Sequence, residues 1–378
     1  MDPDYTYPRF SDAEYERRYE LIYKEMEKNN LDCLIIYGGH RFHNQSFYRW
    51  VNNVPSLIKG FIVFPKKGEP TCFSGAGSSH SINAWKYSSI SDQRPGGADS
   101  VVKRIKELKL DQGKIGIVGR RLFPHVDWVE LKGGLPGATI IDTTDFEHLQ
   151  WVLSPEEIAF MKKAGELTDM VLYAMVEHAK PGITERELYG KAAAAPLPYG
   201  GRFAFLLMGF TPMADPRMSF PDLQATDRKL RVGDIIQNET SIEVEPIGYS
   251  GQLASPIYCG EPTKEYRDLH EITVEVYHRA IRALKPGTIG HEVLKDVTTP
   301  AIEGGYKIPN KPPFWHLWGL GQGGMPQRPF EKNMPVMIQP NVVKEEGFMG
   351  IFMGAVFLVT EFGGKCIQKY PVEQVTIV

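Results

Sequence analysis

The stretch from Asp222 to Glu261 constrains the fold more than any other part of the chain. A Gly-Asp turn signal at residues 233–234 is followed by alternating apolar and polar residues, a turn sequence, and a second short run. This pattern predicts two antiparallel strands. If the turn centres on residues 245–246, Glu239 lies opposite Gln252.

The first of these strands carries an acidic side. Side chains on a strand alternate between its faces, so Glu239, Ser241, Glu243 and Glu245 share one of them. Such a row is typical of a solvated sheet edge, and it is also typical of a polar site. The strand alone leaves both interpretations open.

Further motifs accompany this ribbon, and their residues carry a resemblance. They are TDRKLRVGDII at 226–236, GY and GEP at 248–249 and 260–262, HLWGLGQGGMP at 316–326, MPVMIQPN at 334–341 and GIFMGAVFLVTEFGG at 350–364. Together they resemble the creatinase, aminopeptidase P and methionine aminopeptidase family, also called the pita-bread family, over nearly the whole chain. The resemblance implies an α/β N-terminal domain, residues 1–150, and an α+β pita-bread catalytic domain, residues 151–378.

In the peptidases of that family, five side chains hold two metal ions. By resemblance, the first Asp falls on Glu239 and the second on Gln252, from a ribbon two residues longer than usual. The metal-binding His falls on His316, and the two Glu fall on Gln339 and Gly354. Most of the metal chemistry is therefore missing while the fold signature is kept.

The remaining donors are poor ligands for a two-metal site. A dinuclear divalent centre needs several anionic oxygens, whereas Gln252 and Gln339 offer neutral amide oxygens and Gly354 offers no side chain. Catalytic metals usually have at least three protein ligands. We therefore expect no metal and no other cofactor, as in creatinase and ectoine hydrolase, the family members that act without metal.

The resemblance also suggests which residues carry the chemistry. The family's substrate-side His falls on Asp222 and a later His on Gly323. We predict three catalytic residues: Asp222, Glu239 and His316. We predict substrate contacts from seven others: Gln252, Gln339, Arg328, Tyr249, Glu243, Trp318 and His43. Arg328 would clamp a carboxylate, since a planar guanidinium binds one with two hydrogen bonds, and His43 would belong to a lid loop that also contains residues 48–50.

These residues favour a metal-independent, creatinase-like hydrolase that cleaves a C–N bond in a small polar molecule, one that would carry a carboxylate if Arg328 acts as a clamp. Hydrolysis of an amide or amidine needs a base and a proton donor, which Asp222, Glu239 and His316 can supply. Three alternatives stay open. They are a lyase similar to dimethylsulfoniopropionate lyase, a non-catalytic binding protein, and a residual Xaa-Pro peptidase.

Composition narrows the partners. The chain has 378 residues, four cysteines without metal-ligand spacing, and a net charge of −3. This charge argues against nucleic acid as a partner. No apolar run is long enough to span a membrane, and no signal peptide is visible. We expect a small-molecule substrate, a cytoplasmic location and, by resemblance, a homodimer.

The rest of the chain predicts alternating helices and strands, typical of an α/β layer at the N-terminus. Strands are expected at 34–37, 60–65, 71–74, 114–118 and 139–142, with helices beginning after Ser11 and over 101–110. Residues 192–201 and 208–223 should be loops.

Two related halves are expected in the second domain. A helix begins at Ser154 with a capping box and ends before the Lys-Pro-Gly at 180–182, which recurs at 285–287 after a second predicted helix.

Overall fold

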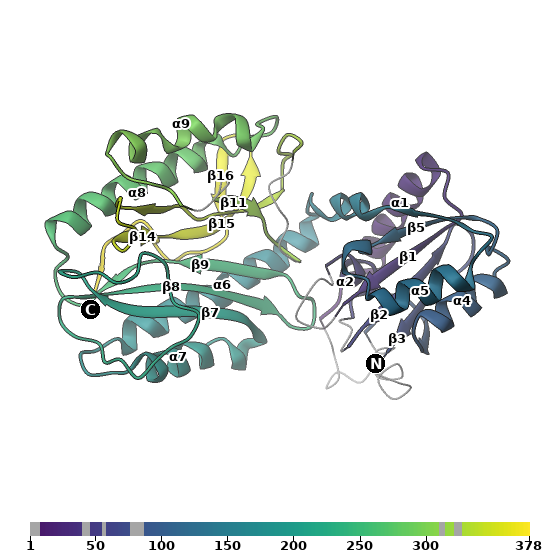
Figure 1. Ribbon diagram of the computed structural model, residues 1–378, viewed down its shortest axis with the longest axis horizontal. Coiled ribbons are helices and arrows are strands. Elements are labelled where there is room, and N and C mark those ends of the chain that lie inside the picture. The colour runs from purple at the N-terminus through teal and green to yellow at the C-terminus, as the bar shows by residue number, and fades with distance from the viewer. Residues whose placement is uncertain (1–7, 40–45, 55–57, 76–86, 310–313, 321–326) are drawn as a thin grey trace. The chain divides into compact units, whose positions relative to one another are not determined.

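The computed structural model describes residues 8–39, 46–54, 58–75, 87–309, 314–320 and 327–378. Contacts divide the chain into two compact units (Figure 1). Unit 1 comprises residues 1–151 with 246–248, and unit 2 comprises residues 152–245 with 249–378. The boundary lies between Trp151 and Val152, and the sequence pattern had placed it after residue 150.

Unit 1 is a six-stranded mixed sheet in the order β4-β3-β2-β1-β5-β6. Its strands are β1 (Cys33–Gly38), β2 (Gly60–Pro65), β3 (Thr71–Ser74), β4 (Asp92–Pro95), β5 (Lys114–Val118) and β6 (Thr139–Asp142). Its helices are α1 (Asp12–Lys28), α2 (Ser46–Asn52), α4 (Ala98–Glu107), η2 (Arg120–Leu122), α5 (His125–Gly134) and η3 (Thr144–Gln150). The expected strands are all present, whereas β4, α2 and α5 were not predicted.

The apolar periodicity of unit 1 explains its layers. Alternate β1 residues such as Ile35 pack with Val101 and Ile105 of α4 and with Leu131 of α5, all of them buried. The α1 helix begins at Ser11, whose hydroxyl accepts from the Glu14 N–H as an N-cap. Its last turn is followed by the buried strand β1, as the sequence indicates.

The predicted lid loop is corrected by the structure for residues 48–50. Tyr48, Arg49 and Trp50 lie in α2 and are buried, with Trp50 fully so. Their aromatic surface fills the interior of unit 1. A mixture of aromatic and charged residues is found both in exposed loops and in short buried helices, so the composition of residues 48–50 did not distinguish the two. His43 lies outside the described residues.

Unit 2 contains a nine-stranded sheet in the order β11-β12-β15-β9-β8-β10-β17, with β16 on β15 and β7 on β8. Its strands are β7 (Gly201–Pro212), β8 (Asp234–Val244), β9 (Ser250–Ala254), β10 (Ile257–Tyr258), β11 (Trp315–Leu317), β12 (Pro335–Ile338), β15 (Gly354–Thr360), β16 (Gly363–Cys366) and β17 (Thr376–Ile377), with β13 (Asn341–Val343) and β14 (Gly350–Phe352) as a separate hairpin. Its helices are α6 (Pro155–His178), α7 (Glu185–Ala194), η4 (Leu197–Tyr199), α8 (Lys264–Ala283) and α9 (Gly290–Glu303).

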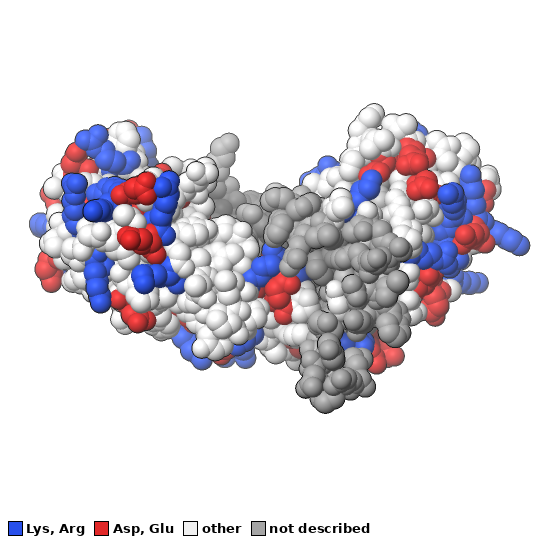
Figure 2. Space-filling view, turned by 90° about the horizontal axis from the view of Figure 1, so that it is seen from below, with Lys and Arg blue, Asp and Glu red and all other residues white. Residues whose placement is uncertain are grey.

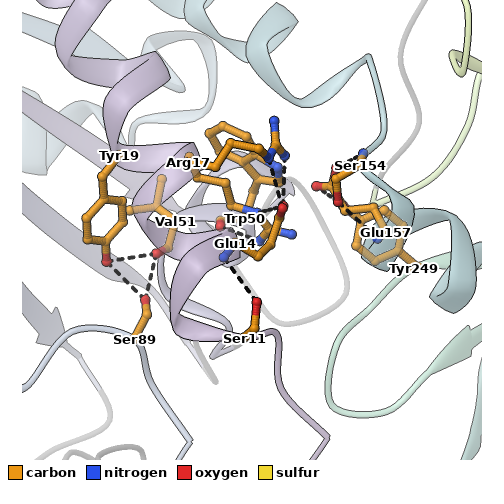
Figure 3. Close-up of polar contacts among 11 residues, drawn as sticks. Ser11, Glu14, Arg17, Tyr19, Trp50, Val51, Ser89, Ser154, Glu157 and Tyr249 are labelled. Carbon is orange, nitrogen blue, oxygen red and sulfur yellow. Dashed lines mark hydrogen bonds and ion pairs between the residues drawn. The ribbon is translucent and has the colours of Figure 1, made fainter.

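Each copy of the Lys-Pro-Gly sequence lies between the two helices of a pair. The first lies between α6 and α7, and the second between α8 and α9. The α6 helix has the expected capping box, in which Ser154 and Glu157 exchange hydrogen bonds (Figure 3). The same device begins α7 at Thr184. These caps fix where each helix starts beneath the sheet.

The loop expected over residues 208–223 is wrong for its first part. Residues 208–212 extend the long strand β7, which pairs with β8. The Pro and small residues that suggested a loop come after it, at 212–216. In the described part of the chain, no helix is long and apolar enough to cross a membrane.

Candidate active site

The predicted ribbon exists, but its register differs from the expected one. Ser241, and not Glu239, lies opposite Gln252. The loop is longer than a turn at 245–246 allows, because the Val244 N–H donates to the Tyr249 carbonyl across residues 245–248. Glu239 and Gln252 remain diagonal neighbours on one face, which is within reach for long side chains.

A row of hydrogen bonds joins four of the predicted site residues. The Gln252 amide Nε2 donates to Glu239 Oε1, and also to Gln339 Oε1 at 3.3 Å. Gln339 Nε2 lies 2.9 Å from His316 Nε2. The sequence placed these four residues in one site, and the structure brings them together.

The two ends of the row come from different parts of unit 2. Glu239 lies on β8 and Gln252 on β9. His316 lies on β11, opposite Met337 of β12, and Gln339 follows β12 directly. The main-chain N–H of Gln339 donates to the Phe314 carbonyl, which fixes this residue beside β11.

The tautomer of His316 follows from its neighbours. Its Nδ1 lies 3.1 Å from the Leu317 carbonyl, which can only accept, so Nδ1 carries the hydrogen. Its Nε2 then accepts from the Gln339 amide. Burial lowers the pKa of His316, and the hydrogen bond to Leu317 opposes this shift. The imidazole is therefore neutral at neutral pH, with the Trp318 ring packed edge-on 5.5 Å away between centroids.

Glu239 has the opposite shift. Burial raises the pKa of its carboxyl from 4.5 to about 7, and the hydrogen bond from Gln252 offsets only part of this effect. The side chain is 5 % exposed. A carboxyl that titrates near neutral pH can both accept and release a proton during a reaction, which is what general acid–base chemistry requires.

Asp222 reaches the same face from a loop. Its Oδ2 lies 3.2 Å from where a side chain would start at Gly209 of β7, and Gly209 is opposite Gln237 of β8. Directly opposite residues share a face, and Glu239 is two residues further along it. Among the described contacts, no hydrogen bond joins Asp222 to the row, and its side chain is exposed.

Other predicted substrate contacts have different surroundings. Glu243 forms an ion pair with Arg202, which also pairs with Glu245. The Tyr249 side chain is fully buried, and its hydroxyl donates to Glu157 Oε1 at 2.7 Å (Figure 3). Each of these two side chains therefore has a partner within the protein, and a substrate contact from Glu243 or Tyr249 stays a prediction.

The other two predicted substrate contacts are Trp318, which lies next to the row, and Arg328, whose link to the row stays a prediction. Trp318 packs on His316 and is 7 % exposed, and Arg328 is exposed. Sequence reasoning missed Gln237, a buried residue on the same face of β8 as Glu239. The period-two alternation that placed Glu239, Ser241 and Glu243 together could have found it.

The position of the family's second metal-binding Glu has no room for a side chain. A Cβ at Gly354 would lie 2.4 Å from the Ile338 carbonyl oxygen and 2.7 Å from the Gln339 Cβ. Gly354 is held on β15 opposite Ala254 of β9, so main chain would have to move. The loss of this ligand is thus built into the packing of the strands.

The residues present do not fit a two-metal centre. The row contributes one carboxylate, Glu239, and an imidazole whose two nitrogens are both engaged. Within the described ranges, no group of three or more His, Cys, Asp or Glu side chains could hold a metal ion. Neutral amide oxygens cannot offset the charge of two divalent cations.

Comparisons with known proteins agree with the fold. The sequence pattern of metallopeptidase family M24 matches residues 159–361. The Xaa-Pro dipeptidase of Pyrococcus furiosus is 24% identical over 282 residues, which cover 70% of this chain and 76% of that protein. The Xaa-Pro dipeptidase of Pyrococcus horikoshii is 21% identical over 363 residues, 93% of this chain and 97% of that protein.

Solved structures extend the likeness to the whole chain. Dipeptidase PepE from Mycobacterium ulcerans superposes with a TM-score of 0.82 and 22% identity, covering 98% of this chain and 100% of that one. The X-Pro aminopeptidase from Thermotoga maritima gives a TM-score of 0.81 at 17% identity, covering 95% and 99%. These likenesses confirm the expected fold, an α/β N-terminal domain followed by a pita-bread domain.

Proposed function

Because the chain belongs to metallopeptidase family M24, we propose that it is a hydrolase of that family which cleaves a C–N bond in a small polar molecule without a resident metal ion. The observation that carries this proposal is the row from Glu239 to His316. It replaces carboxylate ligands with two amides and leaves a carboxyl that titrates near neutral pH.

The proposed chemistry needs one proton to move twice. The Glu239 carboxylate takes a proton from water as the water oxygen bonds to the carbon of the substrate. The resulting carboxylic acid then gives that proton to the nitrogen as the C–N bond breaks. A pKa of about 7 populates both forms of Glu239. Asp222 lies at the exposed rim of the face that carries Glu239 and stays a candidate for further acid–base work. Both nitrogens of His316 are engaged within the row, so we assign this imidazole a positioning role in the scheme.

The two amides have a positioning role in this scheme. Gln252 holds one carboxylate oxygen of Glu239, and Gln339 fixes the imidazole of His316 as its Nδ1–H tautomer. Neither amide changes its charge, so the row keeps the same hydrogen-bond pattern while Glu239 gains and loses a proton. This arrangement supports an enzyme whose proton transfer is centred on one carboxyl.

The test combines metal content with turnover. Purified protein should contain far less than one transition metal per chain by elemental analysis. It should release an amine or ammonia from a small amide or amidine in the presence of a chelator. Glu239→Gln should abolish this release, while Glu261→Gln, at an exposed ion pair with Arg267, should not. Two metals per chain together with chelator-sensitive Xaa-Pro cleavage would refute the proposal.

The partners predicted from the sequence remain part of this proposal. Basic and acidic side chains are interspersed on the described part of the face shown in Figure 2, and the net charge of −3 also argues against nucleic acid as a partner. A homodimer in the cytoplasm stays a prediction, and light scattering at micromolar concentration would test the dimer.

A further inference from the structure

The face of β8 that carries Glu239 also carries a second buried amide. Gln237 and Glu239 point to one side of the strand because they are two residues apart, and Asn238 points to the other. Gln252 of β9 lies on the same side as Glu239, as their hydrogen bond requires. Two amides and one carboxyl therefore share this side of the sheet.

The orientation of both amides is set by their nitrogens. Gln252 Nε2 lies between two acceptors, Glu239 Oε1 and Gln339 Oε1, so its oxygen must point away from both. Gln237 Nε2 donates to the Gly350 carbonyl at 2.8 Å. The oxygens of Gln237 and Gln252 are buried and have no hydrogen-bond partner in the described part of the chain.

Amides with a structural role in this region are paired at both ends. Asn238, on the opposite side of β8, donates to the Ser255 carbonyl and accepts from the Ser255 N–H. Gln368 accepts from the Val356 N–H and donates to the Gln252 carbonyl. Thr240 also has an unpaired hydroxyl, so a single unpaired atom is not evidence of a site. Two amides of fixed orientation beside Glu239 are a stronger observation.

Asp222 adds a fourth acceptor. Its carboxylate lies over Gly209, directly across from Gln237. Gln237, Glu239, Gln252 and Asp222 thus form an acceptor face in which the available atoms are oxygens that accept hydrogen bonds. The buried oxygens of Gln237 and Gln252 cost stability until a donor reaches them.

We infer that the acceptor face binds a small compound presenting at least two N–H donors on nitrogens attached to one carbon, as in a primary amide or an amidine. A group of this kind supplies donors in one plane and can reach the carboxylate and an amide oxygen together. That the bound compound is also the substrate rests on the proposed function. Binding itself does not.

The experiment compares three small planar probes by ligand-observed NMR with the full-length protein. Acetamidinium and acetamide carry N–H donors, whereas N,N-dimethylacetamide has none. The first two should bind at least tenfold more tightly than the third. Equal binding of acetamide and N,N-dimethylacetamide would overturn the inference without any variant being needed.

Two variants locate the binding. Gln237→Met and Gln252→Met keep the side-chain length but remove the oxygen, and each should weaken acetamidinium binding about tenfold. Gln374→Met, at an exposed position near the C-terminus, is the matched control and should bind as the wild type does. Unchanged binding in both folded Met variants would contradict the acceptor face.

Turnover separates this inference from the proposed function. If acetamide binds as described but no C–N bond in any N–H compound is cleaved, the hydrolase proposal fails and the acceptor face stands. If a tertiary amide without N–H donors is cleaved with the same kcat/KM as its primary amide, the acceptor face fails and the hydrolase stands.

Discussion

Two buried glutamates with the same exposure behave in opposite ways. Glu14 in unit 1 and Glu239 in unit 2 are each 5 % exposed. Burial by itself would raise the pKa of both carboxyls. At Glu14 the hydrogen bonds and charges of Arg17 and Arg18 outweigh burial, so the net pKa is lowered, while at Glu239 burial prevails and the net pKa is raised.

The partners explain the difference. Glu14 accepts from Arg17 (Figure 3) and from Arg18. Arg18 is itself fully buried and donates to the Trp50 carbonyl. Among the described residues, the hydrogen-bond partner of the Glu239 carboxyl is a neutral amide, from Gln252. A paired buried carboxylate holds a structure together, whereas one held by an amide keeps the ability to exchange a proton. Equal burial therefore does not imply an equal role.

The largest expected effect is on stability at Glu14. Glu14→Gln removes the carboxylate opposite a buried guanidinium, and losing one partner of a buried pair costs about 3–5 kcal/mol. Denaturant unfolding at neutral pH should show this loss. Glu20→Gln, at an exposed pair with Lys24, should change the free energy of unfolding by well under 1 kcal/mol. Equal effects of the two variants would show that the buried pair at Glu14 contributes no more than an exposed one.

The pH dependence of stability should have the opposite sign at Glu239. A carboxyl whose pKa rises from 4.5 to about 7 on folding leaves the folded state with more bound protons between these values. Stability is then lost as the pH rises from 4.5 to 7, on the order of 3 kcal/mol at 1.36 kcal/mol per pKa unit.

Glu239→Gln should remove that loss. Its free energy of unfolding should match the wild type near pH 4.5 and exceed it near pH 8, as measured by urea denaturation across the range. For Glu14 the sign reverses, since a lowered pKa stabilises the fold above 4.5 and that stability is lost as the pH falls. A parallel pH profile for Glu239→Gln and the wild type would show that Glu239 has an ordinary pKa.

The same variant should also lose activity. If Glu239 transfers the proton, Glu239→Gln should lower kcat by a factor on the order of 10² or more while the fold is kept. Glu14→Gln should leave kcat unchanged wherever the protein remains folded. Turnover is followed by amine release on the substrate found in the metal-independent screen. Full activity of Glu239→Gln would end its catalytic assignment.

The sequence was informative about Glu239 through both its strand pattern and its resemblance to the family. Alternation along the ribbon placed Glu239 and Gln252 close together, and the resemblance to the family added Gln339 and His316 to the same site. The register was wrong by two residues because Pro-Ile-Gly fits turns of more than one length. Gly248, with φ of 90°, closes the longer one.

Other features depend on contacts that a sequence does not carry. The absence of a carboxylate at Gly354 was visible, but the lack of space for any side chain needs the position of the Ile338 carbonyl. The amides of Gln237 and Gln252 each have a paired nitrogen and an unpaired oxygen in the described part of the chain, which can be recognised only from the direction of each nitrogen. The complete burial of Arg18 likewise depends on its contacts with Glu14 and the Trp50 carbonyl.

The smallest effect concerns a third buried glutamate. Glu157 is fully buried and accepts from the Ser154 N–H and the Tyr249 hydroxyl, 2.7 Å from its Oε1. The sequence placed Tyr249 among the substrate contacts, and this hydrogen bond supports a structural role as the alternative. Tyr249→Phe should then cost about 1–2 kcal/mol of unfolding free energy, the value of one lost buried hydrogen bond. KM and kcat should both be unchanged in the folded variant. An increase in KM without a change in stability would instead support Tyr249 as a substrate contact. Glu157, its hydrogen-bond partner, would then belong to the site as Glu239 does.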